Sequence, residues 1–147
     1  MHLSDVLLHP SEYDCTAVEA PWSWLLASDV SLLHVSVFGH LFLSGGDGRI
    51  WLLDSWSGQL YCVGQSYEQH KSQVQTDQEF FETCFFADLV AALNTAGLSR
   101  LPGQVFAPYV SPGIGGSLTP ENFSSAPIRA YAAISAAEAK VLRESSQ

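Results

Sequence analysis

Apolar runs broken by glycine-containing turns dominate the chain between residues 35 and 61. The interruptions fall at Gly45-Gly46-Asp47-Gly48 and at Ser57-Gly58. Glycine adopts a positive φ at no steric cost, so the chain can reverse its direction tightly at both places. The segments around these turns are rich in residues that favour β-strands. They predict strands at about residues 32–37, 40–44, 48–54 and 59–63. The pattern therefore predicts an antiparallel meander.

A helical periodicity of apolar residues replaces the strand pattern after residue 65. A short helix is predicted from Ser66 to Val74, and a long amphipathic helix from Asp77 to Ala96. Asp77 is a favourable N-cap residue, and Gly97 suits the position that follows the last helical turn. Apolar residues recur between them at three- and four-residue steps, so this helix is expected to pack on the core.

The rest of the sequence is predicted to complete a single domain, residues 1–147. Residues 19–27 favour a short helix in which Trp22 and Trp24 anchor the core. Residues 1–17 are weakly patterned, and a partly loose arrangement of this segment is one expectation. Further elements are predicted as a strand at 101–109, a turn at 120–125, a strand at 128–134 and a closing helix at 135–144. The predicted fold class is α+β: an antiparallel sheet, a meander of about five to six strands, packed against a long amphipathic helix and shorter helices.

Composition supports a folded domain in a reducing compartment. Of the 147 residues, 47% are hydrophobic, which is enough for a sizeable core. The longest apolar run, residues 31–43, is too short and too polar to span a bilayer, and no basic segment marks a signal peptide. Cys15, Cys62 and Cys84 are an odd number at wide spacing, and they are predicted to be buried, reduced thiols. These features predict a cytoplasmic protein without a membrane partner.

Charge gives the first indication of a partner. Six basic residues against fifteen acidic ones give a formal charge of −9. Such a surface repels phosphate, so direct binding of nucleic acid is not expected. It attracts a basic partner and speeds the encounter with it. The alternative interpretation is that the negative charge serves solubility alone.

No sequence motif predicts catalysis, a metal or a cofactor. The loop Gly113-Ile114-Gly115-Gly116 lacks the lysine and hydroxyl residue of a phosphate-binding loop, so a backbone turn explains it better. The histidines and cysteines are scattered without metal-ligand spacing. No Gly-x-Ser-x-Gly elbow is present. The chain is therefore predicted not to be an enzyme.

The predicted contact residues are acids near turns and helix ends, with two aromatic anchors. Asp47 and Asp54 also have a structural interpretation, because an aspartate at a turn accepts hydrogen bonds from the local backbone. Trp56 and Tyr67 are predicted to be exposed anchors, with the edge of the core as the alternative. The full set is Asp47, Asp54, Trp56, Tyr67, Glu68, Asp77, Glu79, Glu82 and Asp88.

Three segments together resemble a known family: FGHLFLSGGDGRIWLLDSWSGQL, the helix ending ALNTAGL, and LPGQVFAPYVSPGIGGSLTPENF. Their order and spacing resemble those of the type VI secretion immunity proteins that protect bacteria from a secreted DNase. The resemblance covers about residues 20–145, and His40, Ala107 and Ile114 depart from the family's usual residues. The matching positions are Phe38-Gly39, Asp47-Gly48, Leu53-Asp54, Gly58, Gly103-Gln104, Pro112, Gly115-Gly116 and Asn122.

The resemblance implies a non-catalytic inhibitor that binds a cognate toxin in the cytoplasm and covers its active site. An acidic protein suits this role, because a nuclease needs a positive cleft to hold phosphates. The alternative is a small-ligand or peptide-binding sensor on the same scaffold, which needs a concave apolar pocket with a few polar groups.

Overall fold

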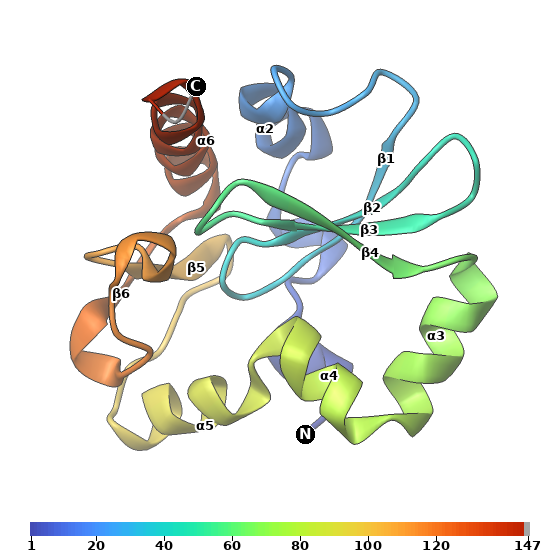
Figure 1. Cartoon of the computed structure of the whole chain (residues 1–147). Coiled ribbons are helices and arrows are strands. Elements are labelled where there is room, and N and C mark those ends of the chain that lie inside the picture. Colours follow the sequence, from blue (N-terminus) through green and yellow to red (C-terminus); the bar gives the residue numbers. More distant parts are fainter. Residues whose placement is uncertain (146–147) are drawn as a thin grey trace.

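The computed structural model of the chain describes residues 1–145 and has an α+β architecture (Figure 1). The strands are β1 (Ser31–Val35), β2 (Leu41–Ser44), β3 (Ile50–Asp54), β4 (Gln59–Gly64), β5 (Gln104–Pro108) and β6 (Phe123–Pro127). The α-helices are α1 (Leu3–Val6), α2 (Cys15–Glu19), α3 (Tyr67–Thr76), α4 (Gln78–Phe85), α5 (Ala87–Thr95) and α6 (Ile128–Ser145). Short 3-10 helices are η1 (Pro10–Glu12), η2 (Ala20–Trp22), η3 (Pro112–Ile114) and η4 (Pro120–Asn122).

The predicted meander is confirmed. Its four strands pair antiparallel in the order β1-β2-β3-β4, with Leu41 opposite Leu53 and Asp54 opposite Gln59. The remaining two strands form a separate antiparallel pair, β5-β6, beside the meander (Figure 1). The six strands therefore belong to two sheets.

The meander is covered on both faces. Successive β2 residues Leu41, Phe42 and Leu43 are each at most 1% exposed, although their side chains alternate between the two faces. Helix α2 lies above the sheet in Figure 1 and α4 lies below it, and the ring of Phe42 meets that of Phe85 in α4 at 5.0 Å. Burial on both faces explains why β2 is a continuous apolar run.

The predicted long helix from Asp77 to Ala96 is interrupted, which corrects the sequence-based expectation. Asp77 does cap α4, accepting a hydrogen bond from the Phe80 N–H at 3.0 Å. Phe86, however, has a left-handed backbone with φ 55°, and it separates α4 from α5. The Glu82 carboxylate then accepts the Asp88 N–H at 3.0 Å and caps α5. No glycine or proline marks this break in the sequence, so the periodicity alone could not locate it.

The C-terminal elements also differ from the prediction. Residues 128–134, predicted as a strand, form the first half of α6, and residues 123–127, within the predicted turn region and just after it, form β6. The apolar run at residue 128 contains many alanines, and its buried positions recur at helical steps. Those positions are Ile128, Tyr131, Ala132, Ser135, Ala136 and Ala139.

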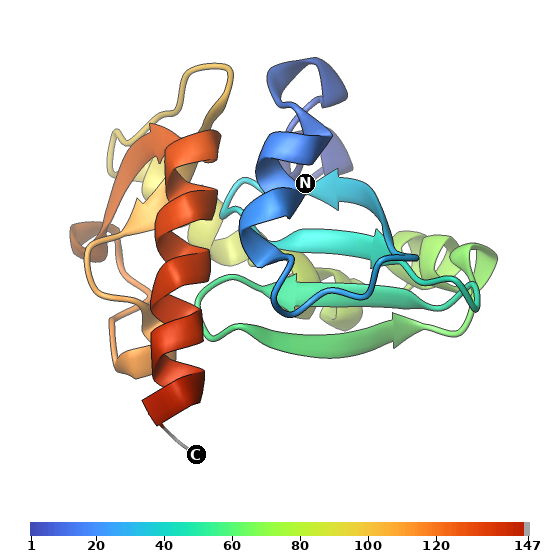
Figure 2. The ribbon, with the colours of Figure 1, turned by 90° about the horizontal axis from the view of Figure 1, so that it is seen from above.

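Helix α6 lies close against two turns of the meander (Figure 2). Gly39 and Gly58 permit this approach, since a Cβ on Gly39 would overlap the Tyr131 ring and a Cβ on Gly58 would lie 2.8 Å from that of Ala139. Both glycines also have positive φ angles, of 79° and 74°. Near the other end of the helix, Arg143 donates to the Gly58 carbonyl at 3.1 Å.

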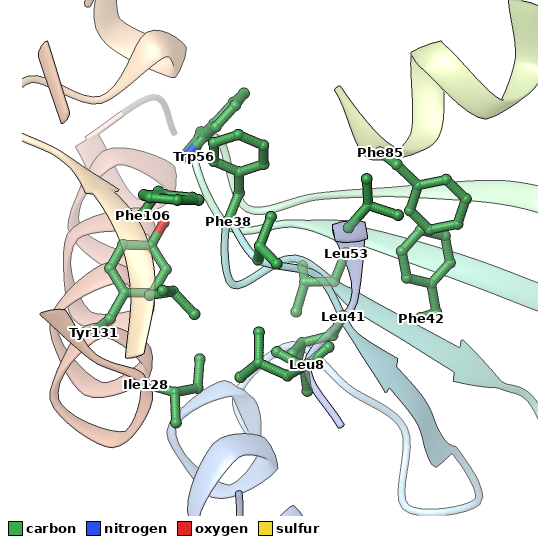
Figure 3. Close-up of a cluster of buried hydrophobic side chains, with 14 of the residues drawn as sticks. Leu8, Phe38, Leu41, Phe42, Leu53, Trp56, Phe85, Phe106, Ile128 and Tyr131 are labelled. Atoms are coloured by element: carbon green, nitrogen blue, oxygen red, sulfur yellow. The ribbon is translucent and has the colours of Figure 1, made fainter. Parts of the chain in front are cut away.

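The core continues from the meander to α6 and β5. Figure 3 shows Phe42 and Phe85 at one end of a cluster of buried side chains, and Phe106, Ile128 and Tyr131 at the other. Trp22 is 1% exposed and belongs to this core, as predicted. None of the helices within residues 1–145 has the length and apolar character needed to cross a membrane.

Two expectations need correction, one on the N-terminal segment and one on the burial of the cysteines. Residues 1–17 are not loose: Val6 and Leu8 are buried, and the Leu8 N–H donates to Val35 of β1 at 2.8 Å. Of the three thiols, Cys84 is buried, which raises its pKa to about 12, but Cys15 and Cys62 are exposed. Cys62 belongs to β4, an edge strand whose residues are mostly exposed or partly exposed.

Replacement of Phe42 by alanine is expected to lower the free energy of unfolding by about 3–5 kcal/mol, because it leaves a cavity between the sheet and α4. Tyr61→Ala is the control, since this β4 side chain is 50% exposed. Its loss should lower the free energy of unfolding by less than about 1 kcal/mol. Urea denaturation measures both, and equal losses would contradict the placement of Phe42.

Candidate functional site

Two hollows on the surface are candidates for partner binding. The first, here named the acidic hollow, lies between the N-terminal residues 1–3 and the helices α4 and α5, and has a volume of about 830 Å³. The second, named the apolar groove, lies between α6 and the segment 109–114, and has a volume of about 490 Å³. The two hollows share no lining residue.

The acidic hollow contains three of the predicted contact residues. Glu79, Glu82 and Asp88 line it, and Asp77 precedes them at the start of α4. Glu79 and Asp88 belong to the first turns of α4 and α5, where the helix dipole stabilises negative charge. No lysine or arginine occurs between residues 77 and 95. The local negative charge is therefore not neutralised by neighbours in the sequence.

The ion pairs of residues 1–145 also leave these four acids unpaired. They join Arg100 to Glu12 at 2.8 Å and Arg49 to Asp47 at 3.6 Å, and His40 lies 3.6 Å from Asp54, a contact that is an ion pair only when His40 is protonated. The four acids of the α4–α5 region thus meet no cation in the described part of the chain. Two of them, Asp77 and Glu82, have a structural role as helix caps.

Three other predicted residues lie outside the acidic hollow. Tyr67 and Glu68 are exposed in the first turn of α3, and Tyr67 is 47% exposed. Asp47 is exposed in the turn between β2 and β3, where it accepts the Arg49 N–H at 3.0 Å and so has the turn-forming role that its position predicts. The nine predicted residues therefore do not form a single site.

Asp54 is partly buried and Trp56 is buried. The Asp54 carboxylate accepts hydrogen bonds from the Trp56 N–H and the Ser57 hydroxyl, both at 2.9 Å, as predicted for an aspartate at a turn. Trp56 is 6% exposed, so its interpretation as an exposed anchor is wrong and the alternative, the edge of the core, is correct. Its ring is packed against Phe38 and Phe86 at centroid distances of 5.6 and 4.9 Å.

A serine, a histidine and an aspartate meet beside Trp56, but not as a catalytic triad. Ser55 contacts His40 Nδ1 through both its N–H, at 3.0 Å, and its Oγ, at 3.1 Å, and Asp54 approaches the same nitrogen at 3.6 Å. A triad needs the serine and the carboxylate on opposite nitrogens of the imidazole. Here the buried Nε2 has no partner among residues 1–145.

The arrangement about His40 is instead a buried polar link between the sheet and α6. The Ser55 Oγ is 2.7 Å from the Tyr131 hydroxyl, so Tyr131 of α6 is joined to His40 through Ser55. Burial lowers the pKa of His40 to about 4, against the opposing effect of Asp54, and raises that of Tyr131. Both side chains are therefore neutral near pH 7. Within residues 1–145, no group of three histidine, cysteine or acidic side chains is placed to hold a metal ion.

The sequence patterns do not predict the apolar groove. One wall is the segment that follows β5, where Tyr109, Val110 and Ile114 are 71%, 49% and 59% exposed. The other wall is α6, where Val141 is 61% exposed. Helical spacing of apolar residues on the solvent side of α6 is the signal that indicates it, but the sequence pattern predicts a strand for residues 128–134.

Hydrogen bonds hold the first wall in place. The Asn122 side chain accepts the Val110 N–H at 2.9 Å and donates to the carbonyls of Val110 and Ser117 at 2.8 and 2.9 Å. The Ser111 hydroxyl donates to the Trp56 carbonyl at 2.6 Å. The segment is therefore fixed to the turn between β3 and β4, and the groove is formed before any partner arrives.

The comparisons with known proteins identify a similar fold and indicate no function. No family model and no curated protein matches the sequence. The structure is similar to the crystal structure of Atu4351 from Agrobacterium tumefaciens, with a TM-score of 0.54 and 18% sequence identity. The match covers 88% of this chain and 65% of that one, so this chain spans less than two thirds of the length of its structural relative. At this identity the similarity shows the fold alone.

The free energy of unfolding is expected to fall as the pH drops from 6.5 towards about 4. Folded His40 stays neutral down to a pH of about 4, whereas in the unfolded chain it takes up a proton near its ordinary pKa of 6.5. Between these values the unfolded state binds more protons, and acidification costs about 1.4 kcal/mol per pH unit from this residue. Burial lowers the pKa of His34 and His70 as well, which adds to the effect.

Urea denaturation across this pH range tests the role of His40. His40→Asn removes the titrating ring but keeps an acceptor for the Ser55 N–H, so the pH dependence should become weaker even though the packing is poorer. His2→Asn is the control, because His2 is exposed. A pH dependence that is the same in His40→Asn and in the wild type would show that the buried imidazole is not its source.

Proposed function

We propose that this chain is an immunity protein that binds a cognate type VI secreted toxin, a nuclease, in the cytoplasm and neutralises it by occluding its active site. The resemblance of residues 20–145 to immunity proteins suggests the role. The observation that carries it in the structure is the group of acids Asp77, Glu79, Glu82 and Asp88, none of which has a cation partner within residues 1–145.

Electrostatic attraction explains how such a surface serves an inhibitor. A nuclease holds its substrate with a cluster of positive charges, because it must neutralise phosphates. An acidic inhibitor is drawn towards the same charges, and long-range attraction raises the rate of association by one to three orders of magnitude, ~10–10³. Nucleic acid itself is repelled by the formal charge of −9. The proposal thus assigns the chain a protein partner and no nucleic acid.

Binding is the whole of the proposed mechanism. Ser55 and His40 are buried, and their contacts with Asp54 lack the geometry of a nucleophile activated by a base, which supports a role without catalysis. Protection from a toxin requires a long-lived complex, with a dissociation constant on the order of nanomolar or lower. Charge attraction mainly changes association, so a long lifetime also needs desolvated apolar contacts.

A peptide-binding sensor is the second candidate function, and the apolar groove is the observation that favours it. Its walls are apolar, and Ser55, Ser111 and Glu138 supply the few polar groups that such a pocket needs. A sensor would bind a free peptide and leave toxin activity unchanged. An immunity protein must abolish that activity.

Co-expression with the candidate toxin encoded beside this gene tests the proposed function directly. The chain should restore growth of cells that produce the toxin, and it should co-purify with the toxin. Catalytically inactive toxin should form the same complex, because binding does not depend on the toxin's reaction. Cells that die at the same rate with and without this chain, combined with the absence of a complex, would refute the immunity function.

Removing charge from the acidic hollow should slow association. The double variant Glu79→Gln/Asp88→Asn is expected to lower the association rate constant about three- to tenfold at low salt, and to weaken its salt dependence. Stopped-flow measurements at low salt and at about 0.5 M salt check this, since added salt screens the same attraction. Glu19→Gln/Asp29→Asn removes equal charge outside the hollow and is the control. Equal rates for the two variants would mean that the hollow has no special part in steering.

A further inference from the structure

We infer that the apolar groove binds an amphipathic helix of the partner, one that carries a basic residue opposite Glu138. This inference rests on the proposed function and deepens it, because it names the surface that anchors the toxin. The acidic hollow attracts the partner over a distance, whereas the groove would hold it once it arrives.

The solvent side of α6 carries a stripe of apolar residues at helical spacing. Ala130, Ile134, Ala137 and Val141 follow one another at intervals of four, three and four residues, and all are exposed. Ala137 and Val141 line the groove, whereas Ala130 and Ile134 line a smaller hollow that continues it and shares Glu138 with it. Ile134 and Val141 are 59% and 61% exposed, unusual values for β-branched apolar residues in a helix that already buries its opposite side. This spacing is that of the contact positions in paired helices. The alanines between the larger residues let a second helix approach closely.

The segment 109–114 supplies the facing wall. Tyr109, Val110 and Ile114 extend the exposed apolar surface away from α6, and Trp56 and Ser55 lie between the two walls. Because Asn122 and Ser111 already hold this wall through hydrogen bonds, binding need not order it. A helix that enters such a groove presents side chains at steps of three and four residues, which matches the stripe on α6.

The charge of the groove indicates which kind of partner binds there. Glu138 is the charged side chain that lines the groove among the described residues, and Lys140 lies on the far side of the stripe, outside the groove. A carboxylate covered by an apolar partner would lose its hydration, so a basic residue opposite it is required for tight binding. A nuclease that binds phosphates is rich in such residues.

A second copy of this chain fits the groove less well. If two copies paired through this groove, each would bring its own Glu138 to the interface, and the groove lining holds no lysine or arginine among the described residues to face it. Two chains that each carry a formal charge of −9 also repel one another. Charge complementarity thus favours a basic partner over self-association.

The test compares dissociation of the complex between this chain and the candidate toxin, in catalytically inactive form. Ile134→Glu/Val141→Glu introduces carboxylates at two exposed helical positions, so the fold should persist, which circular dichroism and thermal unfolding verify. The dissociation rate constant is expected to rise about 100-fold, with little change in the association rate constant. Ala133→Glu/Lys140→Gln changes the charge by the same amount on the side of α6 away from the groove, and should dissociate like the wild type.

Charge at Glu138 provides the second measurement. Glu138→Lys should speed dissociation about tenfold, and Glu138→Gln by a smaller factor, because lysine repels the partner's basic residue whereas glutamine only fails to neutralise it. Faster dissociation of both the Ile134→Glu/Val141→Glu and Glu138→Lys variants supports the inference.

Each contrary outcome has a distinct meaning. If the complex forms normally and dissociates equally slowly for the wild type and for Ile134→Glu/Val141→Glu, the groove is not the binding surface. The proposed immunity function would be unaffected by that result. A wild-type protein that binds no toxin would overturn both. Analytical ultracentrifugation could instead show that the isolated chain is a dimer and that Ile134→Glu/Val141→Glu is a monomer. That result would assign the groove to a second copy of this chain and overturn the inference of a basic partner.

Discussion

The tight turn from Asp54 to Gly58 is the constraint on which the rest of the molecule depends. The Asp54 carboxylate closes the turn by accepting hydrogen bonds from Trp56 and Ser57. From this fixed loop, the Ser55 hydroxyl reaches Tyr131 of α6, and the Gly58 carbonyl accepts from Arg143 at the other end of that helix. The turn thus attaches α6 to the meander.

The same turn also sets the distance between the walls of the apolar groove. The Trp56 carbonyl accepts the Ser111 hydroxyl, which places the segment 109–114 beside α6. Gly113 lies so close to this carbonyl that a side chain there would collide with it. Both walls are fixed to one five-residue turn that lies far earlier in the sequence, so the groove has a defined shape.

Sequence patterns predicted the local features and missed those that depend on packing. Strand propensity, turn residues and capping act over a few neighbouring residues. The sequence therefore predicts the meander, the turn at Asp54, the cap at Asp77 and the buried Trp22. The break at Phe86 and the pairing of β6 with β5 are not predicted, because tertiary contacts impose them on segments with no distinctive local signal. Asp77, Glu79 and Asp88 are exposed and Glu82 is partly buried, but the groove requires two segments to meet in space, which no local pattern predicts.

Hydrogen exchange of the purified complex with the inactive candidate toxin, measured by mass spectrometry, tests the central claim most directly. Residues 109–114 and 134–142 should be strongly protected from exchange on binding, with weaker changes around residues 77–88. Protection confined to other surfaces, or unchanged exchange throughout the chain in the presence of excess toxin, would contradict it.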